Sequence, residues 1–174
     1  SATILIHNHH LSFWNITKDD LYALACKNTP DLQHYELRNM SDVLKELLSD
    51  DDSSAILAPP APFPMYVLSN RTKLNGSACI LYQDLLKNFA ERLRSDLYIL
   101  PSSIHEVLII PVNSFTSPAD PLLSSANSPA DTRQQSYREL SEMVQEVNAT
   151  QLSTEDILSD HVYYYSRESS RITM

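Results

Sequence analysis

The chain has 174 residues, 43% of them hydrophobic and 20% charged, a composition typical of a folded globular protein with one core or two small ones. Its formal net charge of −9 argues against nucleic acid or an anionic membrane as a partner, because both repel an acidic protein. The chain has one glycine, Gly76, which excludes the glycine-rich phosphate loops of dinucleotide-binding and P-loop proteins.

No apolar run approaches the ~20 residues of a membrane-spanning helix. The longest run, residues 107–112, has the length of a strand. A signal peptide with a basic first part is also missing from the sequence. We therefore expect a cytoplasmic protein. We expect no cofactor either, since the glycine-rich loops are excluded. Because the chain begins with Ser1 rather than with methionine, we also expect a processed or excised fragment.

The first 52 residues are predicted to form a small N-terminal subdomain of β and helical segments. Residues 3–7 have the composition of a strand. Thr17 is predicted to begin a helix, with Asp20 three positions later in a capping box, and this helix is expected to end before Pro30. A second short helix is predicted to start at Ser41, which would cap it.

A proline-rich stretch, residues 53–64, is predicted to be a linker. It follows three aspartates, Asp50, Asp51 and Asp52, which resemble part of a calcium-binding loop. These residues lack the central glycine and the terminal glutamate of such a loop. We therefore interpret them as a solvated acidic turn.

The rest of the chain, residues 65–174, is predicted to be an α+β domain with a mainly antiparallel sheet. The expected strands are residues 65–69, 97–101, 104–112 and 161–167, and residues 171–173 are a further short β segment or a tail. Two longer helices, residues 77–94 and 132–147, are expected to cover the sheet. A low-complexity loop is expected at residues 113–132, and a short capped turn of helix at residues 153–158.

Several stretches resemble a known family. Residues 95–107 (SDLYILPSSIHEV) and 158–165 (LSDHVYYY) are similar to a domain-of-unknown-function family of clostridial gut bacteria, and residues 65–70 and 146–150 match the same pattern. The similarity covers most of the chain from about residue 14, with the 113–132 loop as an insertion. The resemblance implies a bacterial, cytoplasmic, C-terminal portion of a longer protein. It implies no activity and no catalytic residue.

Four neighbouring side chains in the predicted hairpin are candidates for nucleophilic catalysis: Ser102, Ser103, His105 and Glu106. A hydroxyl nucleophile needs a base within hydrogen-bonding reach and an acid that orients this base. However, adjacent strand residues point to opposite faces, so His105 and Glu106 are not expected to line one pocket. Serines that follow Pro101 are also typical of a turn, and we favour a structural role for the four residues.

Asp160 and His161, just before the last predicted strand, are candidate metal ligands, with His105 or Glu106 completing the set. The four residues lack the ligand spacing of known zinc motifs. We therefore favour a satisfied polar pair that joins a turn to a strand.

Three histidines near the N-terminus, His7, His9 and His10, are a further candidate metal site, because His7 and His9 would share one face of a strand. A histidine cluster at this place is more typical of a protein surface, which is the interpretation we favour. Cys26 and Cys79 both lie in predicted helices and are expected to be buried free thiols, with a single disulfide as the alternative.

Because no catalytic or metal motif is complete, the chain is predicted to be a non-enzymatic interaction or regulatory module. Its partner would be another protein or a second copy of the chain, bound through an edge strand, and tyrosines 163–165 are a candidate binding face. The alternative is a hydrolase-like or metal-dependent enzyme that uses Ser102, Ser103, His105, Glu106, Asp160 and His161.

Overall fold

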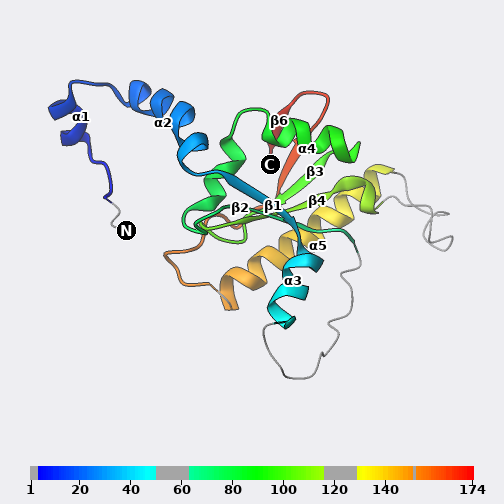
Figure 1. The fold of residues 1–174 in the computed structure, drawn as a ribbon. Helices are drawn as coiled ribbons and strands as arrows, with labels where there is room; N and C mark the ends of the chain where they lie inside the picture. Colours follow the sequence, from blue (N-terminus) through cyan, green and yellow to red (C-terminus); the bar gives the residue numbers. More distant parts are fainter. Residues whose placement is uncertain (1–3, 50–62, 116–128, 151) are drawn as a thin grey trace.

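A six-stranded antiparallel sheet forms the centre of the computed structural model, which describes residues 4–49, 63–115, 129–150 and 152–174 (Figure 1). The strand order is β1-β2-β4-β3-β5-β6. The strands are β1 Tyr35–Asn39, β2 Tyr66–Asn70, β3 Leu97–Leu100, β4 Val107–Pro111, β5 Tyr163–Ser166 and β6 Arg171–Thr173. The predicted α+β fold class and the predicted hairpin of β3 and β4 are confirmed.

Helices cover both faces of the sheet, so its central strands are buried on both sides (Figure 1). The 3-10 helix η1 (Gly76–Leu81) and helix α4 (Leu85–Leu93) pack on one face, and helix α5 (Pro129–Thr150) packs on the other. Ile109 of β4 faces α4, whereas its neighbour Ile110 faces α5, because successive strand residues point to opposite faces. This two-sided burial explains the uninterrupted apolar run of β4.

The N-terminal part contains helices α1 (Asn8–Trp14), α2 (Lys18–Leu32) and α3 (Met40–Ser49). The predicted capping box of α2 is confirmed. Thr17 Oγ1 accepts the Asp20 N–H at 3.1 Å, and the Asp20 carboxylate accepts the Thr17 N–H at 2.9 Å. Neither α1 nor α2 contains a buried residue, and both extend away from the sheet (Figure 1).

Three details of the predicted N-terminal part are wrong. Residues 4–7 do not form a strand, and the chain turns directly into α1. Helix α2 continues through Pro30 to Leu32. Pro30 lacks the N–H for one helical hydrogen bond, and only two further residues follow it in the helix. Asn39 rather than Ser41 caps α3, since Asn39 Oδ1 accepts the Ser41 N–H at 2.9 Å.

The predicted helix 77–94 is divided into η1 and α4. The Tyr82 N–H donates to the Cys79 carbonyl at 3.1 Å, which is the tight spacing of a 3-10 turn, and Tyr82 itself is extended. Asp84 then has a left-handed conformation with φ of 57°. This turn lets α4 start along a new axis, from which Leu85 and Phe89 pack on the sheet.

Strand β1 was not expected from the sequence, and it connects the N-terminal part to the sheet. It pairs with β2 over all five residues, from Tyr35 opposite Asn70 to Asn39 opposite Tyr66. The sheet therefore continues across the boundary proposed between residues 1–52 and 65–174. The acidic turn at residues 50–52, most of the linker 53–64 and residues 116–128 of the low-complexity loop lie outside the described residues.

The predicted last long helix and the C-terminal strands are borne out with small changes, whereas the short helix expected at residues 153–158 does not form. Helix α5 contains the predicted helix 132–147 and is longer at both ends. The predicted strand 161–167 corresponds to the shorter β5, and residues 171–173 form β6. Residues 153–158 contain only a turn, in which the Asp156 N–H donates to the Ser153 carbonyl at 3.0 Å. Among the described residues, no helix combines the length and hydrophobicity needed to cross a bilayer.

Candidate functional site

The loop between β3 and β4 contains most of the candidate catalytic residues, and hydrogen bonds of main-chain groups and serine hydroxyls hold it in place. Ser103 closes it, because its N–H donates to the Glu106 carbonyl at 3.0 Å and its Oγ accepts the His105 N–H at 3.0 Å. Ser103 is buried, whereas Ser102 and Glu106 are partly exposed. The Ser103 hydroxyl therefore stabilises the turn, as the sequence predicted for a serine at this place.

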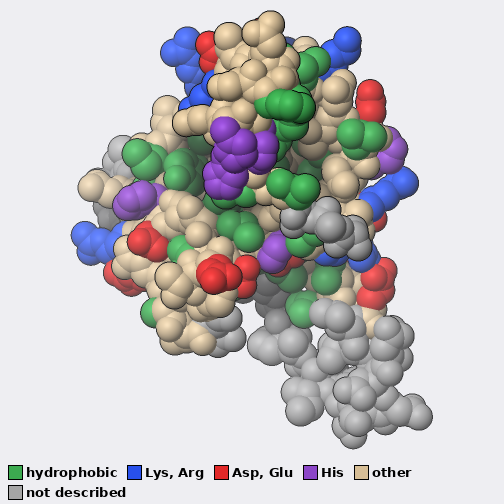
Figure 2. All heavy atoms as spheres, turned by 90° about the vertical axis from the view of Figure 1, so that its left-hand side faces the viewer, with side chains coloured by type: hydrophobic (Ala, Val, Ile, Leu, Met, Phe, Trp, Pro, Cys, Tyr) green, Lys and Arg blue, Asp and Glu red, His purple; other side chains and the backbone are tan. Residues whose placement is uncertain are grey.

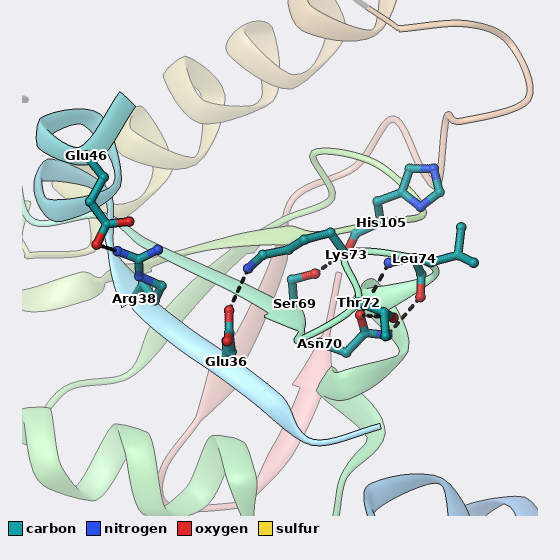
Figure 3. Close-up of polar contacts among 9 residues, drawn as sticks. All are labelled: Glu36, Arg38, Glu46, Ser69, Asn70, Thr72, Lys73, Leu74 and His105. Carbon is teal, nitrogen blue, oxygen red and sulfur yellow. Dashed lines mark hydrogen bonds and ion pairs between the residues drawn. The ribbon is translucent and has the colours of Figure 1, made fainter. Parts of the chain in front are cut away.

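Two buried serines from other elements fix the same loop. Ser77, at the start of η1, donates to the Ile104 carbonyl through its Oγ at 2.6 Å and through its N–H at 3.3 Å. Ser69 of β2 donates through its Oγ to the His105 carbonyl at 2.8 Å (Figure 3). Buried hydroxyls that lack a partner are costly, so these bonds tie the position of the loop to β2 and η1.

Each ring nitrogen of the His105 imidazole faces a polar group of another segment. Nδ1 accepts the Asn75 N–H at 3.1 Å, and Nε2 lies 3.5 Å from Asp156 Oδ1. A nitrogen that accepts a hydrogen bond carries no proton, so the neutral ring has its proton on Nε2, directed at Asp156. Both side chains are a little over one-third exposed.

This arrangement contains the acid and the histidine of a hydrolase triad but leaves no nitrogen for a nucleophile. In a triad, the acid orients one ring nitrogen while the other accepts the serine proton. Here the second nitrogen of His105 is occupied by the main chain of Asn75. His105 is therefore placed to join the loop to η1 and to the 153–156 turn.

Asp160 and His161 do not meet His105 in this arrangement. Asp160 Oδ1 accepts a hydrogen bond from Asn148 Nδ2 of α5 at 2.9 Å. The side chain of His161 is exposed, and its main-chain N–H donates to Ser159 Oγ at 3.2 Å. The hairpin loop does meet the segment after α5, but the residue involved is Asp156. Its carbonyl also accepts the Ile104 N–H at 2.9 Å.

Asp156 is the residue that sequence reasoning missed. The Ser153-x-x-Asp156 spacing indicates a turn, which Ser153 Oγ closes by donating to Asp156 Oδ2 at 2.7 Å. Nothing in that spacing indicates what the turn faces. Within the described part of the chain, no three His, Cys, Asp or Glu side chains are grouped so that they could hold a metal ion.

The three N-terminal histidines lie together on the surface of α1. The ring centroids of His9 and His10 are 3.9 Å apart, and those of His7 and His9 are 5.6 Å apart. Figure 2 shows this group of histidines beneath exposed hydrophobic side chains. His10 Nδ1 accepts the His7 N–H at 3.0 Å, so this ring closes the start of the helix.

A groove of about 730 Å³ lies between α2 and the η1–α4 segment. Its wall includes Cys26 and Pro30 of α2, Tyr35 of β1, and Tyr82 and Leu85 on the opposite side. The Tyr82 hydroxyl donates to the Gln33 carbonyl at 2.6 Å across the base of α2. Burial is the main cause that raises the pKa of Tyr82, so this donor keeps its proton.

The two cysteines are both free, but only one is buried. Cys79 of η1 is 1% exposed, and burial raises the pKa of its thiol. Cys26 is exposed on α2, contrary to expectation. The helix that carries Cys26 has no buried face, which the apolar residues of its sequence do not reveal.

We define residues 4–32 as the N-terminal arm. Its apolar side chains are largely in solvent, with exposed fractions of 86% for Phe13, 78% for Leu32 and 76% for Leu5. The other exposed large apolar side chains of the arm are Ile4, Ile6, Trp14, Tyr22 and Leu24.

A family model matches most of the chain. A model of a family of unknown function, DUF5688, matches residues 1–121 and 129–167. The chain belongs to this family. Membership in DUF5688 confirms the predicted resemblance to a domain of unknown function and assigns no activity. No curated protein matches the chain. No solved structure matches it either.

Proposed function

We propose that the chain is a non-enzymatic interaction module of a cytoplasmic bacterial protein, and that its N-terminal arm docks on a partner protein. The observation that carries this proposal is the exposure of the arm, whose two helices bury no residue. The resemblance to clostridial proteins supports the bacterial and cytoplasmic setting and the placement in the C-terminal portion of a longer protein.

The two short helices of the arm need packing to be stable. Helices of fewer than about 12–15 residues are marginal in water unless one face packs on another element. Helix α1, with seven residues, is well below this length, and α2, with fifteen, is at its upper limit. Phe13 and Leu32 project into solvent. Burial of each such side chain contributes about 1.5–3 kcal/mol, so a partner that covers the arm would stabilise both helices.

The enzyme alternative has less support. A nucleophilic mechanism through His105 needs a ring nitrogen that is free to take a proton, and the Asn75 N–H occupies Nδ1. Asp160 bonds to Asn148 of α5 rather than to His105.

A photo-cross-linking amino acid at position 13, introduced in cells of the source organism, tests the proposal. We expect it to capture a protein that the same group at position 174 does not capture. With that protein purified, Phe13→Ser combined with Leu32→Ser should weaken binding at least tenfold, which corresponds to about 1.4 kcal/mol.

Met174→Ser is the matched control, because Met174 is apolar, 77% exposed and outside the arm. It should leave the affinity unchanged. Equal binding by the arm variant and the wild type, or no captured protein at position 13, would contradict an interaction through the arm.

A further inference from the structure

The edge of the sheet formed by β1 carries a second surface, separate from the N-terminal arm. We propose that two copies of the chain pair through this edge, β1 against β1 and antiparallel, and form a symmetric dimer with one continuous sheet. This inference goes beyond the function proposed for the arm, because it names a second copy as the partner of β1.

The main-chain groups of β1 that face away from β2 follow from its hydrogen bonds. The Arg71 N–H donates to the His34 carbonyl at 3.0 Å, and the Met40 N–H donates to the Met65 carbonyl at 2.8 Å. Hydrogen-bonded positions alternate in an antiparallel pair, so even-numbered residues of β1 face β2. Tyr35 and Leu37 therefore direct their N–H and C=O groups outward. Asn39 adds only its N–H, because its C=O accepts the first hydrogen bond of α3.

The sequence of β1, Tyr-Glu-Leu-Arg-Asn, is self-complementary around its central residue. If Leu37 lies on the two-fold axis, the two Leu37 residues face each other and can exchange two hydrogen bonds. The Asn39 N–H of each copy then faces the Tyr35 carbonyl of the other copy. Glu36 of one copy then lies opposite Arg38 of the second copy, and the reverse pair forms too. These are non-hydrogen-bonded positions, where opposite Cβ atoms are closest, about 4.5–5.5 Å apart.

The charges select this register among the alternatives. A shift by one residue brings outward main-chain groups opposite inward ones, and the hydrogen bonds are lost. A shift by two residues keeps the hydrogen bonds but places Glu36 opposite Glu36 or Arg38 opposite Arg38. Like charges directly opposite each other destabilise a strand pair.

The folded chain already holds both charges in place on one face of the sheet. Lys73 Nζ lies 2.9 Å from a Glu36 carboxylate oxygen, and Arg38 is paired with Glu46 of α3 (Figure 3). The hydrogen bond from Lys73 is the main cause that lowers the pKa of Glu36, which keeps this carboxylate ionised at neutral pH. In the dimer, each Glu36 would lie between its own Lys73 and Arg38 of the second copy. Positively and negatively charged side chains would then alternate across the two strands.

The opposite edge of the sheet is less suited to such pairing. Strand β6 has only three residues, Arg171 to Thr173, and all three are exposed. β5, which carries the tyrosines predicted as a binding face, lies between β3 and β6 and is not an edge strand.

Charge-reversal variants of the full chain, studied by sedimentation equilibrium, test the dimer. Wild type should show a monomer–dimer equilibrium. Arg38→Glu places acids opposite acids and Glu36→Arg places bases opposite bases, so each variant alone should dimerise at least tenfold more weakly. A mixture of the two variants restores opposite charges at every position and should form a heterodimer with near wild-type affinity.

Lys45→Glu is the control, because it reverses an exposed charge that pairs with Asp42 on α3 and not with Glu36 or Arg38. Lys45→Glu should dimerise like the wild type. The arm variant with Phe13→Ser and Leu32→Ser should also dimerise like the wild type, so dimerisation through β1 can be distinguished from binding through the arm. A monomeric wild type, unchanged dimerisation of Arg38→Glu, or failure of the mixture to associate would each overturn the proposal.

Discussion

A Cβ atom on Gly76 would lie only 2.2 Å from the Oγ of Ser69. The His105 carbonyl oxygen and the Asn70 nitrogen would also lie within 2.6 Å of it. Gly76 has no positive φ, so the requirement for glycine here is space rather than backbone handedness. The single glycine of the chain thus lets η1 approach β2 and the hairpin loop, where the buried serines form their hydrogen bonds.

Gly76→Ala should therefore destabilise the protein. The added methyl group meets main-chain atoms that cannot move independently, and overpacking of this kind costs about 1–3 kcal/mol. Denaturant unfolding of Gly76→Ala and the wild type measures the loss in the free energy of unfolding. Ala78→Ser, at an exposed position of the same helix, should change it by less than about 0.5 kcal/mol. An unchanged unfolding midpoint for Gly76→Ala would show that the close approach to Ser69 is wrong.

His105 should carry its proton on Nε2 when the ring is neutral. The Asn75 N–H donates to Nδ1, which requires a lone pair there, and Nε2 faces the Asp156 carboxylate. The two tautomers have different ring ¹⁵N chemical shifts, and a long-range ¹H–¹⁵N NMR correlation distinguishes them. Asp156→Asn should leave the tautomer unchanged, because the Asn75 contact remains. A protonated Nδ1 would contradict the loop geometry.

The two thiols should differ strongly in their reaction with an aromatic disulfide reagent. Cys26 is exposed, whereas Cys79 is buried and its raised pKa lowers the fraction of reactive thiolate. Under native conditions we expect one rapid equivalent, which Cys26→Ser abolishes and Cys79→Ser retains. The second equivalent should appear only when denaturant unfolds the chain. Rapid modification of Cys79 in the native protein would contradict its burial.

Tyr164 should titrate well above an ordinary tyrosine. Burial, followed by the hydrogen bond that its hydroxyl donates to the Asp96 carboxylate, raises the pKa of Tyr164 to about 12. The folded state therefore keeps the phenol proton where the unfolded state, with a pKa of about 10, loses it. This contribution to stability is complete below about pH 10 and disappears as pH rises to about 12.

An ultraviolet phenolate titration of Tyr164→Phe against wild type checks this value. The variant should lack the transition near pH 12, and its stability should fall less steeply between about pH 10 and 12. Asp96→Asn removes the negative charge beside the hydroxyl and should lower the pKa of Tyr164. The same pKa in wild type and Asp96→Asn would argue against the Tyr164–Asp96 contact.

The central part of the fold could be predicted because its signals are local. An apolar run flanked by turn residues defines β3 and β4, and the spacing of Thr17 and Asp20 defines the start of α2. β1 also carries a local signal, the alternation of Glu36, Leu37 and Arg38, but it is short and lies between two helices. Its place beside β2 depends on pairing with a strand about thirty residues later.

The candidate site was predicted only in part, because its contacts join distant segments. Ser103 and His105 were among the candidate residues, but whether their loop meets the segment after α5 was left open by the sequence. The candidate for such a contact was Asp160, in the metal-site alternative, whereas the structure places Asp156 beside His105. Turn composition identifies a turn but not the direction in which its carboxylate points.

The strand order has a consequence for how the chain folds. β3 and β4 are adjacent in sequence and lie in the middle of the sheet, while β1 and β6 lie at its two edges. Contacts between residues close in sequence form early, because closing a short loop costs little conformational entropy. We therefore expect the sheet to grow outward from its central hairpin. β1 would then join late, which leaves the edge with the self-complementary sequence open until the rest of each monomer has formed.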